Sequence, residues 1–392
     1  MSMLKRDQIH GDIEFSKSEL KLIDSKSFVR QRYIRQLGFV DCEYPGATHT
    51  REAHALGTCA CVTDMYKAVI TNNPKFYREG DLELLRMCAL VHDMGHAPFS
   101  HSSEELSTIS HEDRLYGILE LEKNNIVFPN PYDIESWELV FQVYNGSGLT
   151  YLSDKHLISL HSFLDNVIDA DKLDYLERDA LNCGVSYGNF DRDGLVNNLT
   201  MLESKNNNFV MAVKTPGVQA LESFILARYY MFSQVYMSPM ERLRRQMFCD
   251  EMKTLLPGGI YPEDAKKFLQ LDDSRYIRRL KCITTLPYTL VYDGEYNIEI
   301  KSLIDRKLGE YLVCDTPRQS IFRRETEESP ILIVDPILDR VIPSDEASPL
   351  LRLIENMHIH KLRYYTKHSL VDSMREQLKK LLKGGVAYDN IR

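Results

Sequence analysis

The stretch from Leu84 to His101, LLRMCALVHDMGHAPFSH, joins an apolar helical run to polar residues that could bind a metal ion. The run ends on the adjacent pair His92 and Asp93, and His96 follows shortly after, beside a glycine and a proline. Imidazole nitrogens and carboxylate oxygens are good ligands for divalent metals, and a buried helix gives them a rigid support. The alternative is a capped helix end with hydrogen-bonded core histidines. Because unpaired polar groups are costly to bury, their concentration here favours a functional site.

Two residues outside that stretch could complete a metal site. His54 lies on the first turns of a helix expected from Arg51 to about Ile70. Asp171 lies in an apolar-periodic segment, Lys155 to Cys183, that predicts one long helix. Taken singly, His54 could be a core histidine, and Asp171 could belong to a solvated acidic face.

Together these residues form a set of two imidazoles and two carboxylates: His54, His92, Asp93 and Asp171. Such a set suits a divalent transition metal or magnesium and leaves positions open for water and a substrate. Adjacent residues on a straight helix diverge by about 100°, so His92 and Asp93 reach one ion only because their helix ends there. The pattern therefore predicts a metal site where three helices meet.

The composition is that of an ordinary globular protein, with 43% hydrophobic and 27% charged residues among 392. This length predicts one large domain with an appendage, or two domains. Acidic residues outnumber basic ones by 57 to 48, giving a net charge of -9. A chain-wide basic footprint for nucleic acid is therefore absent, although local clusters could still hold phosphates.

The 8 cysteines show no CxxC pair and no regular disulfide spacing, which suits a reducing compartment. The first residues, MSMLKRDQIHGDIEF, have no apolar run of the kind a signal peptide needs. No stretch of the sequence reaches the length of a membrane span. We therefore expect a cytoplasmic protein without a membrane contact.

The segment patterns predict a mainly α fold with a helical core and a smaller C-terminal α+β region. We expect an extended or loosely structured arm over 1–23 within a helical domain over 1–283, and a C-terminal region over 284–392. In the helical domain Val218 to about Leu256 predicts one long helix, and Phe209–Val213 a strand. Past 283 the runs TLPYTLVYD, YLVCD and ILIVDPI favour strands.

The order H…HD…D resembles the signature of the HD phosphohydrolase superfamily. The surrounding runs YPGATHTREAHALG, HDMGHAPFSH, SHED and DADKLDYLERD are similar to motifs of the deoxynucleoside triphosphate triphosphohydrolases in that superfamily. The nearest type is the one with a sterile alpha motif and an HD domain, together with its single-domain prokaryotic relatives. The resemblance covers roughly residues 22–255, and several motifs in order make it far more specific than a bare HD doublet.

The resemblance implies an HD-domain helical core and a reaction in which water attacks the α-phosphorus of a deoxynucleoside triphosphate, releasing a deoxynucleoside and inorganic triphosphate. It implies a divalent ion (manganese, magnesium, iron, zinc or nickel) on the ligands His54, His92, Asp93 and Asp171. A relay for protons near the α-phosphate would comprise His96, Glu104 and His111. Glu104 stands where close relatives have an aspartate, so it departs from the pattern by one methylene.

The resemblance also implies a substrate pocket. Arg51, Lys172 and Arg228 would hold the triphosphate, whose roughly four negative charges need local cations despite the acidic total. The base and sugar would be contacted by another group of residues: Gln36 and Leu37 against the base, Tyr175 and Asp179 at the 3′-hydroxyl, and Tyr236 near the ribose, where it would exclude a 2′-hydroxyl. For each, a packing or surface role is the alternative.

Further partners follow from the same resemblance. We expect a homo-oligomer, dimer or tetramer, and a C-terminal region that serves oligomer contacts or regulation. Asp24 and Arg32 stand where regulated relatives bind an activating guanine nucleotide, although the rest of that activator site is not convincing and no sterile alpha motif domain is expected before it.

Two other functions stay open from the sequence. One keeps the metal site in a phosphatase or phosphodiesterase for another nucleotide or phosphate ester. The other is a non-enzymatic binder of nucleotides or single-stranded nucleic acid through basic residues such as Arg242–Arg245. We do not favour nucleic-acid binding, because a binder has no need of His96 and His111.

Overall fold

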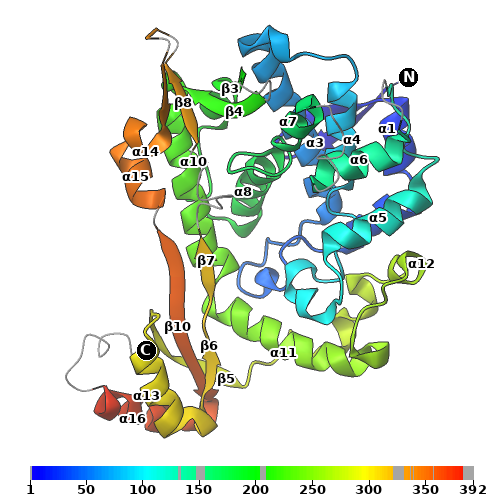
Figure 1. Cartoon of the computed structure of the whole chain (residues 1–392). Helices are drawn as coiled ribbons and strands as arrows, with labels where there is room; N and C mark the ends of the chain where they lie inside the picture. Colours follow the sequence, from blue (N-terminus) through cyan, green and yellow to red (C-terminus); the bar gives the residue numbers. More distant parts are fainter. Residues whose placement is uncertain are drawn as a thin grey trace.

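Helix α3 (Arg51–Asn72) packs against both α4 (Asp81–Val91) and α8 (Ala170–Cys183) at the centre of a mainly α-helical body (Figure 1). The buried face of α3 is apolar and includes Cys59, Val62 and Met65. This computed structural model describes residues 2–130, 134–146, 155–203, 209–320, 331–335, 337–338, 340–355 and 357–382. The predicted fold class, with a smaller sheet-containing C-terminal region, is confirmed.

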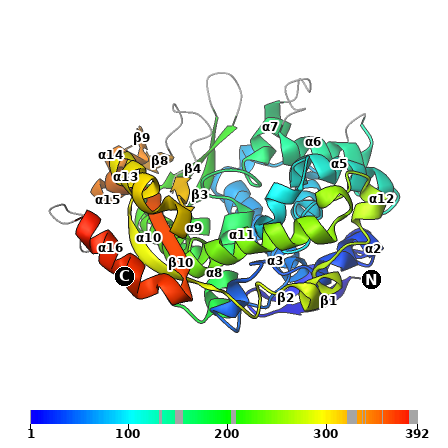
Figure 2. The same cartoon turned by 90° about the horizontal axis from the view of Figure 1, so that it is seen from below.

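The first residues are more ordered than the loose arm expected over 1–23. Strands β1 (Met3–Asp7) and β2 (Gly11–Phe15) form an antiparallel hairpin, and α1 (Lys17–Ile23) follows. A capping box starts α1, since the Ser16 side chain accepts from the backbone N–H of Glu19 and the Glu19 side chain accepts from that of Ser16. The hairpin lies at the opposite end of the molecule from α16 (Val371–Leu381) (Figure 2).

The prediction of one continuous helix over Lys155–Cys183 is wrong, because the structure has two helices there. Helix α7 (Lys155–His161) ends at a series of turns, and α8 begins at the N-cap Asp169, whose side chain accepts from the Lys172 N–H at 2.8 Å. An aspartate competes for backbone donors and so favours a helix start over a helix interior. This break places Asp171 in the first turn of α8.

The helix predicted over Val218–Leu256 is also divided. Helix α10 (Val218–Met231) passes into a π-helical turn, η6 (Phe232–Tyr236), and α11 (Pro239–Leu255) starts afresh. Ser238 caps α11 and Pro239 occupies its first turn, where a missing N–H costs nothing. The π-turn aims Tyr236 at α8.

Two four-stranded sheets flank the helices. In the first, β3 (Leu199–Glu203), β4 (Phe209–Lys214), β8 (Leu332–Asp335) and β9 (Arg340–Pro343) lie in that order, with β4 and β8 parallel. In the second, β10 (His358–Lys367) pairs with β5 (Tyr288–Glu295), β6 (Val313–Asp315) and β7 (Arg318–Ser320). The predicted strand Phe209–Val213 and the three C-terminal strand runs are confirmed.

The remaining helices cover the sheets and the rim of the body. The α-helices are α2 (Lys26–Val29), α5 (His111–Glu122), α6 (Ser136–Asn145), α9 (Arg192–Val196), α12 (Ala265–Phe268), α13 (Ile298–Leu308), α14 (Ser344–Ala347) and α15 (Pro349–Glu355). The 3-10 turns are η1 (Arg30–Tyr33), η2 (Val40–Cys42), η3 (Pro74–Phe76), η4 (Ser100–Leu106), η5 (Thr215–Gly217), η7 (Pro257–Gly259), η8 (Asp273–Arg275), η9 (Ile277–Arg279), η10 (Gly309–Tyr311) and η11 (His368–Leu370). Within the described ranges, no helix combines the length with the hydropathy that crossing a membrane requires.

The main hydrophobic core extends past residue 283. Ile333, Leu351 and Ile354 belong to it, whereas Tyr292 and Leu362 belong to a second, small core under α13 and α16. The chain after 283 thus contributes both to the body and to a unit of its own, and the division into 1–283 and 284–392 remains a proposal.

Replacing Gly57 by alanine should destabilise the protein, although alanine is the better helix former. Gly57 lies inside α3, and a Cβ there would overlap the side chains of Asp174 and Arg178 on α8. We expect a loss of about 1–3 kcal/mol, the usual effect of overpacking, measured by denaturant unfolding.

Gly117→Ala is the matched control, since a Cβ at this position in α5 would meet only Ala265 Cβ at 3.5 Å. That variant should be neutral or stabilised by up to about 1 kcal/mol. Equal stability of the two variants would contradict the close approach of α8 to α3.

Candidate metal centre

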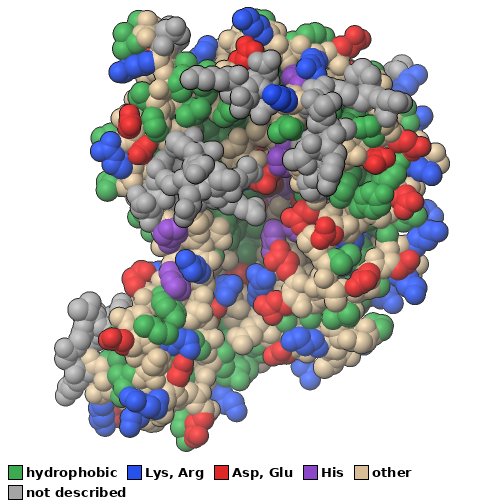
Figure 3. Space-filling model, in the orientation of Figure 1, with side chains coloured by type: hydrophobic (Ala, Val, Ile, Leu, Met, Phe, Trp, Pro, Cys, Tyr) green, Lys and Arg blue, Asp and Glu red, His purple; other side chains and the backbone are tan. Residues whose placement is uncertain are grey.

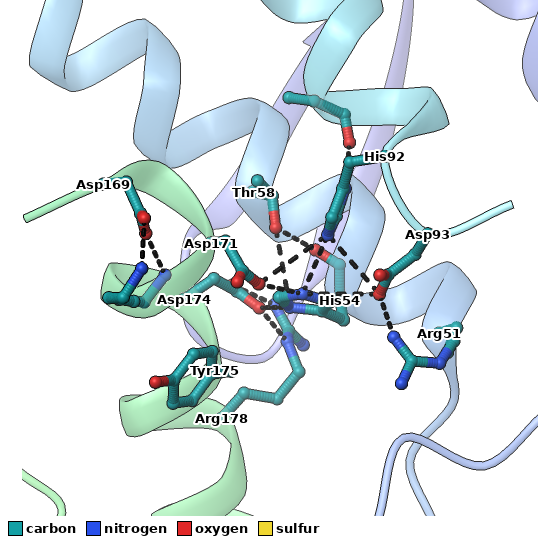
Figure 4. A network of polar contacts seen from close by, with 12 residues as sticks. Arg51, His54, Thr58, His92, Asp93, Asp169, Asp171, Asp174, Tyr175 and Arg178 are labelled. Atoms are coloured by element: carbon teal, nitrogen blue, oxygen red, sulfur yellow. Dashed lines mark hydrogen bonds and ion pairs between the residues drawn. The ribbon is translucent and has the colours of Figure 1, made fainter. Parts of the chain in front are cut away.

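The four predicted ligands converge on one point (Figure 4). His54 comes from α3, His92 and Asp93 from the end of α4, and Asp171 from α8. His54 Nε2 lies 2.8 Å from Asp171 Oδ1, 3.2 Å from His92 Nε2 and 3.7 Å from Asp93 Oδ2. His92 Nε2 lies 3.4 Å from Asp93 Oδ2 and 3.7 Å from Asp171 Oδ1. His54, His92 and Asp93 thus lie close enough together to hold one ion, and Asp171 adjoins the two imidazoles.

Hydrogen bonds at the far side of each ring orient the two histidines. His54 Nδ1 lies 2.7 Å from Asp174 Oδ2, and His92 Nδ1 lies 2.7 Å from the carbonyl oxygen of Ala89. Both acceptors lack a proton, so each Nδ1 is the donor and each Nε2 is left with a lone pair. The two Nε2 atoms face each other at 3.2 Å, so that a proton or a metal ion between them would make this contact favourable. The donor set therefore fits a divalent metal ion.

The electrostatics of the cluster agree with that fit. Burial alone would lower the pKa of His54, but its contacts with Asp171 and Asp174 raise it to about 10. Burial would raise the pKa of Asp93, yet Arg51, His92 and His96 hold it well below its usual range. Ionised carboxylates thus surround a position that favours positive charge.

A second group of imidazoles adjoins the ligands. The rings of His96 and His111 stack at 3.9 Å, and His101 meets His96 edge-on at 4.8 Å. His96 Nε2 lies 3.2 Å from Asp93 Oδ1, and His101 Nδ1 lies 2.5 Å from Glu104 Oε1. The structure therefore brings the predicted relay residues together and adds His101, which ends the same motif but was not predicted to belong to the relay.

These groups differ in charge. Burial, together with the nearby Arg51 and His111, lowers the pKa of His96 well below its usual value, so that this imidazole is neutral at pH 7. Burial would raise the pKa of Glu104, but the contact with His101 lowers it to about 2. A neutral imidazole and a carboxylate-held imidazole are suited to moving protons.

A cavity of about 300 Å³ opens beside the relay, and its lining includes His96, Glu104 and His111. Histidine and acidic side chains are visible along a hollow on this face of the body (Figure 3). Arg51 binds Asp93 and donates from Nε to Ser100 Oγ at 2.7 Å, while its buried Nη2 has no hydrogen-bond partner among the described residues. Arg51 thus keeps a spare, buried cationic donor beside Asp93.

The predicted sugar contacts form a network one to two turns farther along the same face of α8. Asp179 lies between Tyr236, whose hydroxyl donates to Oδ2 at 2.6 Å, and His49, whose Nε2 lies 2.7 Å from Oδ1. The Tyr175 and Tyr236 rings meet edge-on at 6.1 Å. His49 was missed from the sequence, although it stands within the run THTREAH.

The remaining predicted substrate residues lie close by with different partners. Arg228 Nη1 donates to the Tyr175 hydroxyl at 3.4 Å, and its buried Nε has no partner in the described part of the chain. Lys172 is bound to Asp169. Gln36 is buried with an unpaired Oε1, again among described residues, and Leu37 packs against the core.

The loop that carries His101 is held under backbone strain. Phe99 and Ser100 both have positive φ, at 64° and 54°, which is unfavourable for residues other than glycine. The buried Asp273 compensates by accepting the Phe99 N–H at 2.7 Å and the Arg35 N–H at 2.9 Å. Asp273 belongs to no motif, so only the structure reveals this support.

Comparisons with known proteins agree with this geometry. Residues 49–179 match the HD domain, and residues 190–290 match the HD associated region. The chain therefore contains an HD domain followed by an HD associated region.

Particular relatives extend over different parts of the chain. An uncharacterized protein of Methanocaldococcus jannaschii is 34% identical over 68% of this chain and 51% of its own length. The deoxynucleoside triphosphate triphosphohydrolase SAMHD1 of Mus musculus is 31% identical over 47% of this chain and 32% of its own. The crystal structure of a hypothetical protein from Aquifex aeolicus superimposes with a TM-score of 0.79 at 26% identity, covering 97% of this chain and 100% of that one. The chain spans about half the length of the first curated relatives it matches.

A buried glutamate beneath η4 should make stability depend on pH. Burial raises the pKa of Glu241 to about 8, and among the described residues its Oε1 accepts a hydrogen bond from Ser102 Oγ alone, at 3.2 Å. The folded state therefore holds a proton that the unfolded chain releases near pH 4.5, so stability should fall as pH rises from about 4.5 to 8. Glu241→Gln, which mimics the protonated form, should remove this fall of about 1 kcal/mol per pH unit in denaturant titrations.

The control is Glu120→Gln, on the exposed face of α5. Its stability difference from the unmodified protein should stay constant over the same pH range. A Glu241→Gln difference that also stays constant would refute the assignment of a buried, protonated carboxyl group.

Proposed function

We propose that this protein hydrolyses deoxynucleoside triphosphates to a deoxynucleoside and inorganic triphosphate with the help of a divalent metal ion. The observation that carries the proposal is the convergence of His54, His92, Asp93 and Asp171 beside stacked relay imidazoles and an arginine with a spare donor. When bound, the ion would polarise a phosphate oxygen and lower the pKa of its water.

The surrounding side chains have separate roles in this proposal. Arg51 and Arg228 would bind phosphate oxygens through Nη2 and Nε, which have no other partner in the described residues. His96, neutral and held by Asp93 at Nε2, would accept or give a proton at Nδ1, while Glu104 keeps His101 oriented. Lys172 would have to release Asp169 or act on phosphate as part of that ion pair.

Selection of a deoxyribose would depend on the network around Asp179. The Tyr236 hydroxyl and His49 fix this carboxylate, and Tyr175 lies edge-on to Tyr236. In the proposal Asp179 and Tyr175 meet the 3′-hydroxyl, and the Tyr236 ring fills the space of a 2′-hydroxyl. The name of the mouse relative, which matches over less than half of this chain, supports the same substrate class.

One observation favours a second candidate, a phosphatase or phosphodiesterase for a smaller phosphate ester. Lys172, one of the cations expected at the triphosphate, is already neutralised by the buried Asp169. A substrate with fewer charges would need only Arg51 and Arg228.

A binder that uses the basic group Arg242–Arg245 is disfavoured. Arg242 is bound to Asp315, Arg244 donates to the carbonyl oxygens of Cys282 and Ile283, and Arg245 lies 3.4 Å from Glu104. These cations are used within the protein. A homo-oligomer, a nucleotide activator at Asp24 and Arg32, a cytoplasmic location and a regulatory C-terminal region stay predictions.

The proposed reaction predicts release of inorganic triphosphate from at least one common deoxynucleoside triphosphate in the presence of manganese or magnesium. His92→Ala and Asp171→Ala should each lower the rate by more than about 100-fold, because even the partners of metal ligands account for about 10- to 100-fold. His358→Ala, an exposed position on β10, is the control. If no deoxynucleotide yields triphosphate but a simple phosphate ester is hydrolysed, the second candidate replaces the first.

Tyr236 should discriminate between sugars. Truncation by Tyr236→Ala opens the space beside Asp179, so we expect the ratio of ribonucleotide to deoxynucleotide turnover to rise by about tenfold or more, as expected for losing roughly 1–3 kcal/mol of discrimination. The half-exposed neighbour Tyr230 provides the control Tyr230→Ala. A ratio that is the same in both variants would exclude Tyr236 from sugar selection.

A further inference from the structure

The N-terminal hairpin inserts one side chain behind the metal centre. His10 lies in the turn between β1 and β2, and its Nε2 is 2.7 Å from Asp174 Oδ1 on α8. The two side chains are 3% and 0% exposed. Asp174 Oδ2 in turn lies 2.7 Å from Nδ1 of the metal ligand His54. A continuous line of three side chains thus connects the first residues of the chain to the ligand.

We propose that His10 and Asp174 are positioning residues for the metal centre: His10 fixes Asp174, and Asp174 fixes the ring of His54 so that Nε2 faces the ion. The inference rests on the proposed metal centre, and it is independent of which phosphate compound is hydrolysed.

Hydrogen bonds from the backbone to Asp7 fix the turn that presents His10. Asp7 Oδ1 accepts the backbone N–H groups of Ile9 at 2.8 Å and His10 at 3.0 Å, which closes the turn, and Gly11 follows with a φ of 71°. Asp7 Oδ2 lies 3.0 Å from Nη1 of Arg178 on α8. A two-stranded hairpin is marginal alone, so these contacts set where it lies.

Every acceptor site of the Asp174 carboxylate is occupied. Oδ1 accepts from His10 and from Arg178 Nη2, and Oδ2 accepts from His54 and from Arg178 Nε, the arginine contacts each being 2.8 Å. A carboxylate with all four positions filled cannot rotate without breaking a buried bond. Gly57 of α3 leaves the space in which this carboxylate lies against His54.

The chemistry of ligand support explains the arrangement. A carboxylate behind a ligating histidine fixes the tautomer and ring orientation and makes the coordinating nitrogen more basic. Without the donor from His10, the Asp174 carboxylate could turn toward Arg178 alone and weaken its bond to His54. Loss of the His10 side chain should therefore lower the affinity of the site for the ion.

A second metal site is the competing explanation, because Cys61 Sγ, His10 Nε2 and an Asp174 oxygen also lie near one another. Cys61 Sγ is 3.8 Å from His10 Nε2. An ion there would have to displace hydrogen bonds on a filled carboxylate and lie beside the Arg178 guanidinium, which disfavours it.

The experiment is a titration of metal-free protein with manganese alone, following binding by calorimetry, with unfolding temperature measured in parallel. We expect Asp174→Asn to weaken manganese binding by about 10- to 100-fold, and His10→Ala to weaken it by a smaller but measurable factor of at least about three. His10→Gln, whose amide can still donate to Asp174, should recover part of the affinity.

A buried pair of the same kind supplies the control. His156 Nε2 lies 2.7 Å from Asp81 Oδ2, with side chains 3% and 2% exposed, and the contacts described for this pair are to residues such as Tyr66 and Phe76 rather than to the proposed ligands. His156→Ala should lower the unfolding temperature but leave manganese affinity unchanged. Because His10 lies on a surface hairpin, its variants remain testable even if Asp174→Asn does not fold.

Two results would overturn the inference. One is that His10→Ala lowers the unfolding temperature as His156→Ala does while its manganese affinity equals that of the unmodified protein. The other is that the unmodified protein binds two ions and His10→Ala binds one, which would assign His10 to a second site. Neither result depends on hydrolysis. If the protein hydrolyses no deoxynucleotide but the variants change manganese affinity as expected, the proposed function fails and this inference still holds.

Discussion

The contact between His54 on α3 and two carboxylates on α8 is the interaction on which the rest of this structure depends. Asp171 and Asp174, one helical turn apart, take opposite nitrogens of the same ring at 2.8 and 2.7 Å. Because Gly57 has no Cβ, α3 and α8 can approach closely enough for this contact. Asp174 also gathers Arg178 and the N-terminal hairpin, so packing of two helices and assembly of a metal centre are the same event.

Other segments then meet this pair of helices through polar contacts rather than through apolar packing alone. Helix α4 ends at Val91, which frees His92 and Asp93 to turn toward His54. The following loop accepts positive φ at Phe99 and Ser100, held by Asp273 from far along the chain. The backbone of this loop is thus strained at two residues, and hydrogen bonding to the carboxylate of Asp273, distant in the sequence, holds it in that conformation.

The sequence indicated the four side chains proposed as ligands, but it did not indicate the residues that support them. His54, His92, Asp93 and Asp171 could be predicted because their residue types are chemically informative and their motifs are local. The helix starts at Asp169 and Ser238 were missed, because the apolar periodicity continues through both positions. In each case a single N-cap residue determines where the new helix begins. The partners of His10 and Asp273 lie 164 and 174 positions away, so only the folded chain brings them together.

The same design links ion binding to stability. Several carboxylates and imidazoles are buried within a few ångströms of one another, an arrangement that costs free energy unless opposite charge is present. Arg51 and Arg178 supply part of that charge by pairing with Asp93 and Asp174. Asp171 has only the two imidazoles among the described ion-pair partners. An ion at this point would therefore stabilise the meeting of α3, α4 and α8 in addition to any action on a phosphate.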